Sequence, residues 1–232
     1  MSSIAENLEV VRSRMEAACA RAGRDPADVR LVAVSKTFGP EAVDEAIRAG
    51  ADLLGENRVQ EAAGKIPVCA SAEWHLIGHL QTNKVRHALP LFTMLHSIDT
   101  VKLLETIAKE ADESGYRPEI LLEVNVAGEA SKFGFKPDEV APALEAATSF
   151  GAPPVVGLMT VPPFRPDAEA VRPYFRALRE LRDRLQDETG FALPHLSMGM
   201  SHDFEIAIEE GATFVRVGSA IFGQRSYMKA KL

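Results

Sequence analysis

Residues 30–49 have the sequence RLVAVSKTFGPEAVDEAIRA, in which a short apolar run leads into an amphipathic stretch. The run at Arg30–Ser35 is almost continuously apolar, as a strand is when both of its faces are buried. The stretch at Pro40–Ala49 has apolar residues at helical spacing. This segment therefore predicts one strand followed by one helix.

The same strand–helix unit recurs along the chain. We expect strands at Arg30–Ser35, Leu53–Gly55, Trp74–Gly78, Met94–Ile98, Ile120–Val126, Val155–Met159, His195–Met198 and Phe214–Val217. We expect helices at Pro40–Ala49, Val59–Lys65, Thr82–Leu89, Val101–Ser114, Pro137–Ser149, Ala168–Thr189, Asp203–Glu210 and after Ser219. Alternation of this kind favours parallel connections, and eight units predict an α/β fold: one closed (β/α)8 TIM barrel over residues 1–232. An open, doubly wound sheet is the structural alternative.

An extra helix is expected before the barrel. Apolar residues recur at steps of three and four from Ile4 to Ala18, and Gly23 is a suitable stop for this helix.

Composition and charge exclude several classes of protein. The net charge of -7 argues against a general binder of nucleic acid or of anionic membranes. The two cysteines, Cys19 and Cys69, make neither a disulfide framework nor a metal cluster. No segment approaches the roughly 20 apolar residues of a membrane span, and the N-terminus lacks the apolar block of a signal peptide. We therefore expect a cytoplasmic protein without nucleic-acid or membrane partners.

Polar residues follow the predicted strands. In (β/α)8 barrels the chemistry lies at the C-terminal ends of the strands, where side chains from different strands converge. The residues at these positions include Lys36, Glu56, Asn57, His79, Ser97, Asp99, Asn125, Thr160, Ser201 and Ser219. Ser201, Asp203 and Asp99 also have a structural alternative, because each could cap the helix that follows it.

Lys36 and the turns after the last two strands suggest a site for pyridoxal 5'-phosphate (PLP). A lysine amine forms a Schiff base with an aldehyde, and a desolvated lysine titrates low enough to do so. The alternative is that Lys36 simply extends into solvent at a strand exit. Turns after the last two strands are the usual phosphate site of this architecture, and Gly218 would let backbone approach a phosphate closely.

Arg216 lies inside the last predicted strand, between two valines. A buried arginine needs a partner, which could be a core carboxylate such as Glu123 or the ring nitrogen of a cofactor. Because arginine keeps its proton, it would donate to an unprotonated ring nitrogen. That contact would weaken the ring as an electron sink.

The chain resembles the pyridoxal phosphate homeostasis proteins, a PLP-binding family that shares the N-terminal barrel fold of alanine racemase. The resemblance covers nearly the whole chain. It rests on several motifs in the right order: AVSK (33–36), GENRVQE (55–61), WHLIGHLQTNK (74–84), SKFG (131–134), GLMT (157–160), LSMGMS (196–201) and VRVGSAIFG (215–223).

The resemblance implies a role for each residue of the site. Lys36 would carry PLP as an internal aldimine, with Asn57 beside the cofactor and Arg216 near its ring nitrogen. The phosphate site would be built from Ser201, Gly218 and Ser219, with the turn of Ser197, Met198 and Gly199 close by. His202 is expected to face away from the site.

The same resemblance bears on whether the protein is an enzyme. It implies that racemase-like relatives take a catalytic tyrosine from a second, β-rich domain, which we expect this chain to lack. None of Tyr116, Tyr174 and Tyr227 lies at a predicted strand end, whereas a racemase needs an acid/base on each face of the substrate carbon.

We therefore expect a non-catalytic, monomeric carrier and regulator of intracellular PLP that serves apo PLP-dependent enzymes, with Lys132 assisting release of the cofactor. The alternatives are a PLP-dependent racemase or lyase acting on small amino acids, and a barrel enzyme for a phosphorylated substrate without cofactor.

Overall fold

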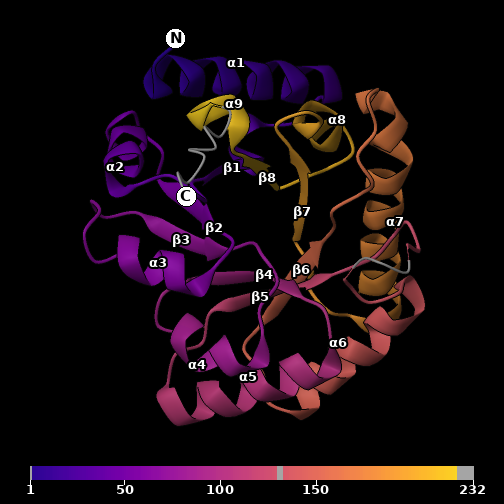
Figure 1. The fold of residues 1–232 in the computed structure, drawn as a ribbon. Coiled ribbons are helices and arrows are strands. Elements are labelled where there is room, and N and C mark those ends of the chain that lie inside the picture. Colours follow the sequence, from indigo (N-terminus) through magenta and orange to yellow (C-terminus); the bar gives the residue numbers. More distant parts are fainter. Residues whose placement is uncertain (1, 130–132, 224–232) are drawn as a thin grey trace, which may run out of the picture.

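The structure is a computed structural model that describes residues 2–129 and 133–223, and its strands form a closed parallel barrel (Figure 1). The strands are β1 (Arg30–Val34), β2 (Leu53–Glu56), β3 (Glu73–Leu76), β4 (Met94–Ile98), β5 (Glu119–Glu123), β6 (Val155–Met159), β7 (His195–Met200) and β8 (Phe214–Val217). The predicted barrel is confirmed, and the open-sheet alternative is wrong because β8 pairs with β1.

The seam between β1 and β8 closes the barrel and sets the geometry of its mouth. Val32 pairs with Arg216 and Ala33 with Val217. The chain therefore leaves both strands at the same level, and Lys36 and Gly218 follow two neighbouring strand ends.

Helices surround the barrel, and α2 to α8 connect its strands (Figure 1). They are α1 (Ile4–Ala22), α2 (Pro40–Arg48), α3 (Val59–Lys65), α4 (Val85–Ala88), α5 (Val101–Ser114), α6 (Val140–Ser149), α7 (Arg172–Thr189), α8 (Phe204–Glu209) and α9 (Ser219–Phe222). Short 3-10 helices lie at η1 (Pro26–Asp28), η2 (Thr82–Lys84), η3 (Pro137–Glu139) and η4 (Ala168–Val171). Three predicted helices thus begin with a 3-10 turn, at Thr82, Pro137 and Ala168.

The expected N-terminal helix is α1, and both of its ends are capped. Ser3 and Glu6 form a capping box, and Gly23 ends the helix in the left-handed conformation, with φ of 63°. The buried side of α1 contacts α8 and α9, which it overlies in Figure 1. An ion pair of 2.8 Å between Arg14 and Glu205 adds a polar link to α8.

The apolar residues form two separate cores. The larger one lies between the barrel and its helices and includes the outward-facing Val215 and Val217. The smaller one, with Val32, Leu53 and Phe214, lies inside the barrel. Several buried polar side chains are enclosed with this inner core: His75, His96, Ser197 and Arg216.

Two further findings concern the cysteines and the possibility of a membrane span. Both cysteines, Cys19 and Cys69, are free thiols. Across residues 2–129 and 133–223, no helix has the length and apolar character needed to span a membrane.

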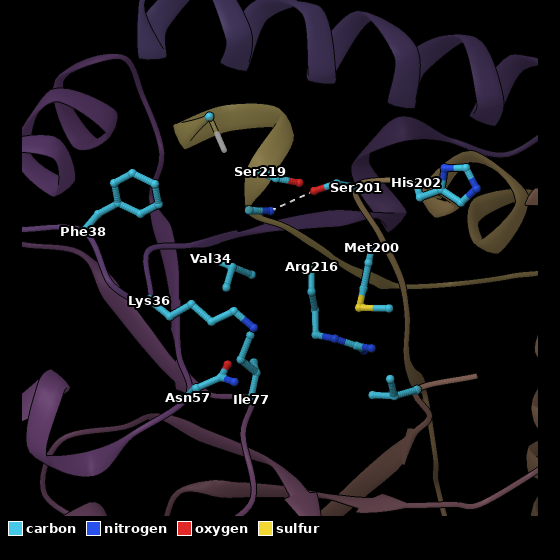
Figure 2. Close-up of a pocket in the computed structure, with 13 residues that line it drawn as sticks. Val34, Lys36, Phe38, Asn57, Ile77, Met200, Ser201, His202, Arg216 and Ser219 are labelled. Carbon is cyan, nitrogen blue, oxygen red and sulfur yellow. Dashed lines mark hydrogen bonds between the residues drawn. The ribbon is translucent and has the colours of Figure 1, made fainter. Parts of the chain in front are cut away.

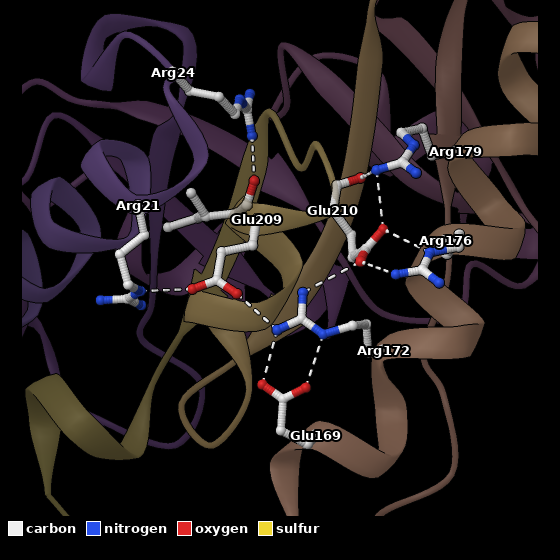
Figure 3. Close-up of polar contacts among 9 residues, drawn as sticks. Arg21, Arg24, Glu169, Arg172, Arg176, Arg179, Glu209 and Glu210 are labelled. Atoms are coloured by element: carbon white, nitrogen blue, oxygen red, sulfur yellow. Dashed lines mark hydrogen bonds and ion pairs between the residues drawn. The ribbon is translucent and has the colours of Figure 1, made fainter.

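A cluster of ion pairs joins α7 to the end of α8 (Figure 3). The Glu210 carboxylate is only 5% exposed and lies within 3.2 Å of Arg172, 2.9 Å of Arg176 and 2.9 Å of Arg179. Glu209 pairs with Arg172 and with Arg21 of α1, each at 2.7 Å. Burial alone would raise the pKa of Glu210, but the arginines hold it below its usual range. Since α8 follows the β7 exit, the cluster fixes an element that borders the barrel mouth.

We predict that Glu210→Gln lowers the free energy of unfolding by about 1.5–3 kcal/mol at pH 7, the range for hydrogen bonds to charged groups. A carboxylate with a depressed folded-state pKa stabilises above its unfolded pKa and loses that contribution as the pH falls through its folded pKa. The difference from wild type should therefore shrink below about pH 4. Urea unfolding at several pH values measures it.

The matched control is Glu188→Gln, which removes an exposed partner 4.0 Å from Arg184 on α7. This change should alter stability by less than about 0.5 kcal/mol. Equal losses in both variants, or a Glu210→Gln loss that does not depend on pH, would contradict the assignment.

Candidate functional site

A cavity of about 440 Å³ opens at the C-terminal ends of β1, β7 and β8 (Figure 2). Its polar lining comes from Lys36, Asn57, Ser201, His202, Arg216, Gly218 and Ser219. Its apolar lining comes from Val34, Phe38, Ile77, Val161 and Met200, and Gly223 completes the lining. The cavity lies where the sequence predicted the site, at the end of the closing seam.

Lys36 reaches into the cavity from the exit of β1 (Figure 2). The next residue, Thr37, has a φ of 72°, which a β-branched residue adopts only under strain. The backbone N–H of Thr37 donates to the Glu61 carboxylate of α3. This bond holds the chain in the strained turn, so the base of the lysine side chain is fixed by α3.

Behind Lys36, a buried ion pair supports the same strand exit. Lys65 donates to Glu56 Oε1 at 2.7 Å, to Glu61 Oε1 at 2.8 Å and to the Ser35 carbonyl at 2.9 Å. Ser35 Oγ also donates to Glu56 Oε1, at 2.7 Å. Lys65 thereby joins both carboxylates to the residue before Lys36.

Glu56 is fully buried, and its Oε2 atom accepts no hydrogen bond within the described part of the chain. Burial raises the pKa of Glu56, against the opposing effect of Lys65 and Ser35. The charge of Lys65 therefore offsets part of the desolvation cost of burying the Glu56 carboxylate.

The wall opposite Lys36 is a cradle of backbone N–H groups at the β8 exit. Ser201 Oγ accepts from the N–H of Gly218 at 3.2 Å (Figure 2). It also accepts from the N–H of Ala220 at 3.4 Å. A Cβ atom on residue 218 would lie 3.3 Å from the Val34 carbonyl oxygen, which is tighter than ordinary contact. Glycine at 218 thus keeps this wall close to β1, and the serine hydroxyls of the wall can donate to an anionic group.

Arg216 forms the floor between these two walls (Figure 2). Its guanidinium donates to Ser197 Oγ at 2.6 Å and to the Thr160 carbonyl at 2.9 Å. Burial lowers the pKa of Arg216 to about 10, against the opposing charges of Glu123 and Asp203. Arg216 remains a cation at neutral pH and can only donate hydrogen bonds.

The structure brings most of the predicted site residues together. Lys36, Asn57, Ser201, Arg216, Gly218 and Ser219 all line the cavity, whereas Ser197, Met198 and Gly199 do not. The predicted turn at residues 197–199 is part of β7, which continues to Met200.

The three residues of this strand segment have different surroundings. Ser197 lies inside the barrel, while Met198 packs into the outer core. Gly199 has a φ of 90°, and a Cβ there would lie 2.5 Å from that of Ala207. Because residue 199 has no side chain, α8 can pack closely against β7.

Two smaller expectations need correction. His202, expected to face away, contributes to the cavity lining, although it is exposed and its Nε2 atom is 3.1 Å from the Pro166 carbonyl. Asp99 does not cap α5, because Thr100 supplies that cap and Asp99 instead bonds His79 at 2.8 Å.

Other predicted strand-end residues line a second, neighbouring hollow. His79 and Asn125 line it, with the ring of Phe133 stacked 4.2 Å from that of His79. The predicted convergence at one mouth is therefore divided between two hollows that share Ile77 and Val161. Residues 130–132, which include Lys132, lie outside the described residues. No group of His, Cys, Asp or Glu that could hold a metal ion occurs within the described ranges.

The chain is similar to known proteins over nearly its full length. The profile for "Alanine racemase, N-terminal domain" matches residues 1–226. A curated protein of Aquifex aeolicus, named pyridoxal phosphate homeostasis protein, is 47% identical over 96% of this chain and 98% of its own length. One of Pseudomonas aeruginosa with the same name is 44% identical over 98% of each chain. PipY of Synechococcus elongatus, solved with PLP bound, has a TM-score of 0.83 at 35% identity and covers 95% of this chain and 100% of its own.

From the geometry of the site we predict that Lys65→Met lowers the free energy of unfolding by about 3–5 kcal/mol at pH 8, the usual effect of leaving a buried charge unpaired. Without Lys65 the pKa of Glu56 rises further. A carboxyl with a raised folded-state pKa destabilises as the pH rises above its unfolded pKa, so the loss should be smaller at pH 5 than at pH 8.

Adding Glu56→Gln to Lys65→Met removes the unpaired charge and should recover most of the lost stability. Urea unfolding of both single variants and the double variant, at both pH values, tests this. Full additivity of the two substitutions would contradict the assignment.

Proposed function

The chain belongs to the family of pyridoxal phosphate homeostasis proteins, built on the barrel of the alanine racemase N-terminal domain, and we propose that it binds PLP in the cavity between Lys36 and Gly218 and acts in PLP homeostasis. The observation that carries this proposal is the position of Lys36. Its amine faces the wall formed by Ser201 and the Gly218 turn, and the Arg216 guanidinium lies between them. Residues 1–232 would form one domain around this site.

The donor set fits each part of PLP. Ser201 Oγ accepts from the N–H groups of Gly218 and Ala220, which leaves its hydroxyl proton to donate to a phosphate, and the Ser219 hydroxyl lines the same wall. Val34, Ile77 and Met200 offer apolar surface to a flat ring. Asn57 borders the cavity beside Lys36 and can bond a ring substituent.

Lys36 and Arg216 would have different roles. When PLP is bound, its aldehyde condenses with a lysine amine and gives a linkage that borohydride reduces. Lys36 is the residue whose side chain enters the cavity in the position to supply that amine. Arg216 would hold the ring from below by donating a hydrogen bond to its unprotonated nitrogen.

A carrier role is favoured over turnover of amino acids. An arginine partner discourages protonation of the ring nitrogen, and with it the stabilisation of carbanions that PLP enzymes exploit. Of the three tyrosines, Tyr116 and Tyr174 do not line the cavity, and Tyr227 lies outside the described residues. We extend the proposal to a monomeric cytoplasmic protein that hands PLP to apo-enzymes, with release assisted by Lys132.

We predict that the purified protein, supplied with PLP, shows a visible absorbance band that borohydride removes and that Lys36→Ala lacks. The reason is that no other lysine among the described residues lines the cavity. The control is Lys109→Ala, which changes an exposed lysine on α5 and should keep the band. A wild-type protein that stays colourless with added PLP would overturn the proposal and favour a phosphorylated substrate bound without cofactor.

We also predict that Ser201→Ala weakens PLP binding about tenfold, the effect of losing one hydrogen bond to a charged group. The variant should bind pyridoxal, which lacks the phosphate, as wild type does. Fluorescence titration with both ligands measures the two dissociation constants. Equal losses for pyridoxal and PLP would place the phosphate elsewhere.

A further inference from the structure

A continuous chain of hydrogen bonds runs through the interior of the barrel to the floor of the cavity. Glu73 Oε1 is 3.0 Å from His75 Nε2, and His75 Nδ1 is 2.9 Å from His96 Nε2. His96 Nδ1 is 2.8 Å from Ser197 Oγ, which accepts from Arg216 at 2.6 Å. We call Glu73, His75, His96 and Ser197 the interior chain.

The two ends of the interior chain lie at opposite ends of the barrel. Glu73 is the first residue of β3, and its side chain is 32% exposed beside Arg30, which donates to it at 2.6 Å. His75, His96 and Ser197 are fully buried, and Arg216 lines the cavity at the other end. The chain thus connects the N-terminal mouth of the barrel to the proposed cofactor site.

Chemistry fixes the direction of every bond in the chain. At the N-terminal mouth, the Glu73 carboxylate can only accept a hydrogen bond, so His75 must carry its proton on Nε2. A neutral His75 then accepts at Nδ1, which requires His96 to donate from Nε2 and to accept at Nδ1. Ser197 must therefore donate its hydroxyl proton to His96.

The other end of the chain gives the same direction independently. Arg216 can only donate, so Ser197 Oγ accepts from it. If His96 also donated to Ser197, the buried hydroxyl proton of Ser197 would have no acceptor, an arrangement that proteins avoid. Burial lowers the pKa of both histidines, which favours the neutral form that this order needs.

We propose that the interior chain is a positioning device for Arg216, in which the Glu73 carboxylate polarises four aligned hydrogen bonds and so aims the guanidinium at the ring nitrogen of PLP. The inference rests on the proposed function for its ligand, but the order of donors belongs to the protein alone. Aligned bonds strengthen one another in a medium of low polarity. Ser197 is thereby a better acceptor for Arg216 than an isolated hydroxyl.

Other charges that face the chain do not replace Glu73. Arg216 also experiences Glu123 and Asp203, and His195 packs against Phe214 beside the two histidines without bonding to them. Its closest polar partner is Thr213 Oγ1 at 3.3 Å. His195, a partly buried histidine beside the same phenylalanine, therefore provides a control residue.

The first test reads the protons of the apo-protein. Long-range 1H–15N spectra distinguish the two neutral tautomers of histidine and should show His75 and His96 both protonated on Nε2 at pH 7. Glu73→Gln keeps an acceptor but removes the charge, and it should shift the His96 and Arg216 side-chain signals. Arg30→Met removes the cation that pairs with Glu73 Oε2 but leaves the Thr93 hydroxyl on Oε1, and it should shift them less. An Nδ1-protonated tautomer for either histidine in the wild type, or unchanged Arg216 signals in Glu73→Gln, would overturn the proposal.

The second test measures PLP binding. His96→Phe interrupts the chain and should raise the dissociation constant about tenfold, as expected for the loss of one bond to a charged group. Glu73→Gln should raise it about threefold, because cooperative strengthening is a fraction of each bond. His195→Phe should leave it unchanged.

The outcomes separate this inference from the proposed function. Wild-type affinity in both His96→Phe and Glu73→Gln would refute the positioning role while leaving PLP binding intact. A wild-type protein that fails to bind PLP would refute the proposed function, and the spectra of the apo-protein would still decide the order of donors. If His96→Phe does not fold, Glu73→Gln, at the half-exposed mouth, carries the binding test.

Discussion

Pairing of β8 with β1 is the constraint on which the site depends. The register that joins Val32 to Arg216 closes the barrel and puts the exits of both strands side by side. Lys36 and the Gly218 turn, nearly the full chain apart in sequence, become facing walls of one cavity. A slip of two residues along this seam would keep every side chain on its own face but move the amine about 6–7 Å along the cradle, at the strand rise per residue.

Closure of the barrel also creates the main electrostatic problem of the structure. Arg216 is only 4% exposed at the floor of the cavity, and its desolvation must be offset by acceptors and nearby charge. The interior supplies the Ser197 hydroxyl, the Thr160 carbonyl and the more distant carboxylates of Glu123 and Asp203. Behind Lys36, the ion pair of Lys65 with Glu56 solves a similar problem on the other side of β1. Buried ion pairs of this kind stabilise poorly compared with apolar packing, so the value of the Lys65–Glu56 pair here lies in fixing the strand exit that carries Lys36.

Much of the fold could be predicted because strands buried on both faces leave a clear sequence pattern. The ends of the strands could then be located, and topology alone assigned Lys36 and Gly218 to one mouth. The error at Ser197–Gly199 arose because β7 continues through a register irregularity between Ser197 and Met200, which no local pattern signals. The interior chain was also beyond sequence analysis. Period-two alternation predicts that Glu73 and His75 share a face, but only the strand-to-strand register brings His96 and Ser197 between His75 and Arg216.

The arrangement bears on why such a barrel would hold PLP without using it as an enzyme does. An electron sink requires a protonated ring nitrogen, which an acidic partner would stabilise and a cation opposes. Every donor of the interior chain points away from the cavity toward Glu73, so the chain offers Arg216 acceptors and cannot deliver a proton to the ring. Reversal would leave Ser197 with a buried hydroxyl proton and no acceptor, which costs about 1–3 kcal/mol. In the proposed function, the residues of this chain therefore favour a cofactor that is bound, held and released over one whose ring is primed for catalysis.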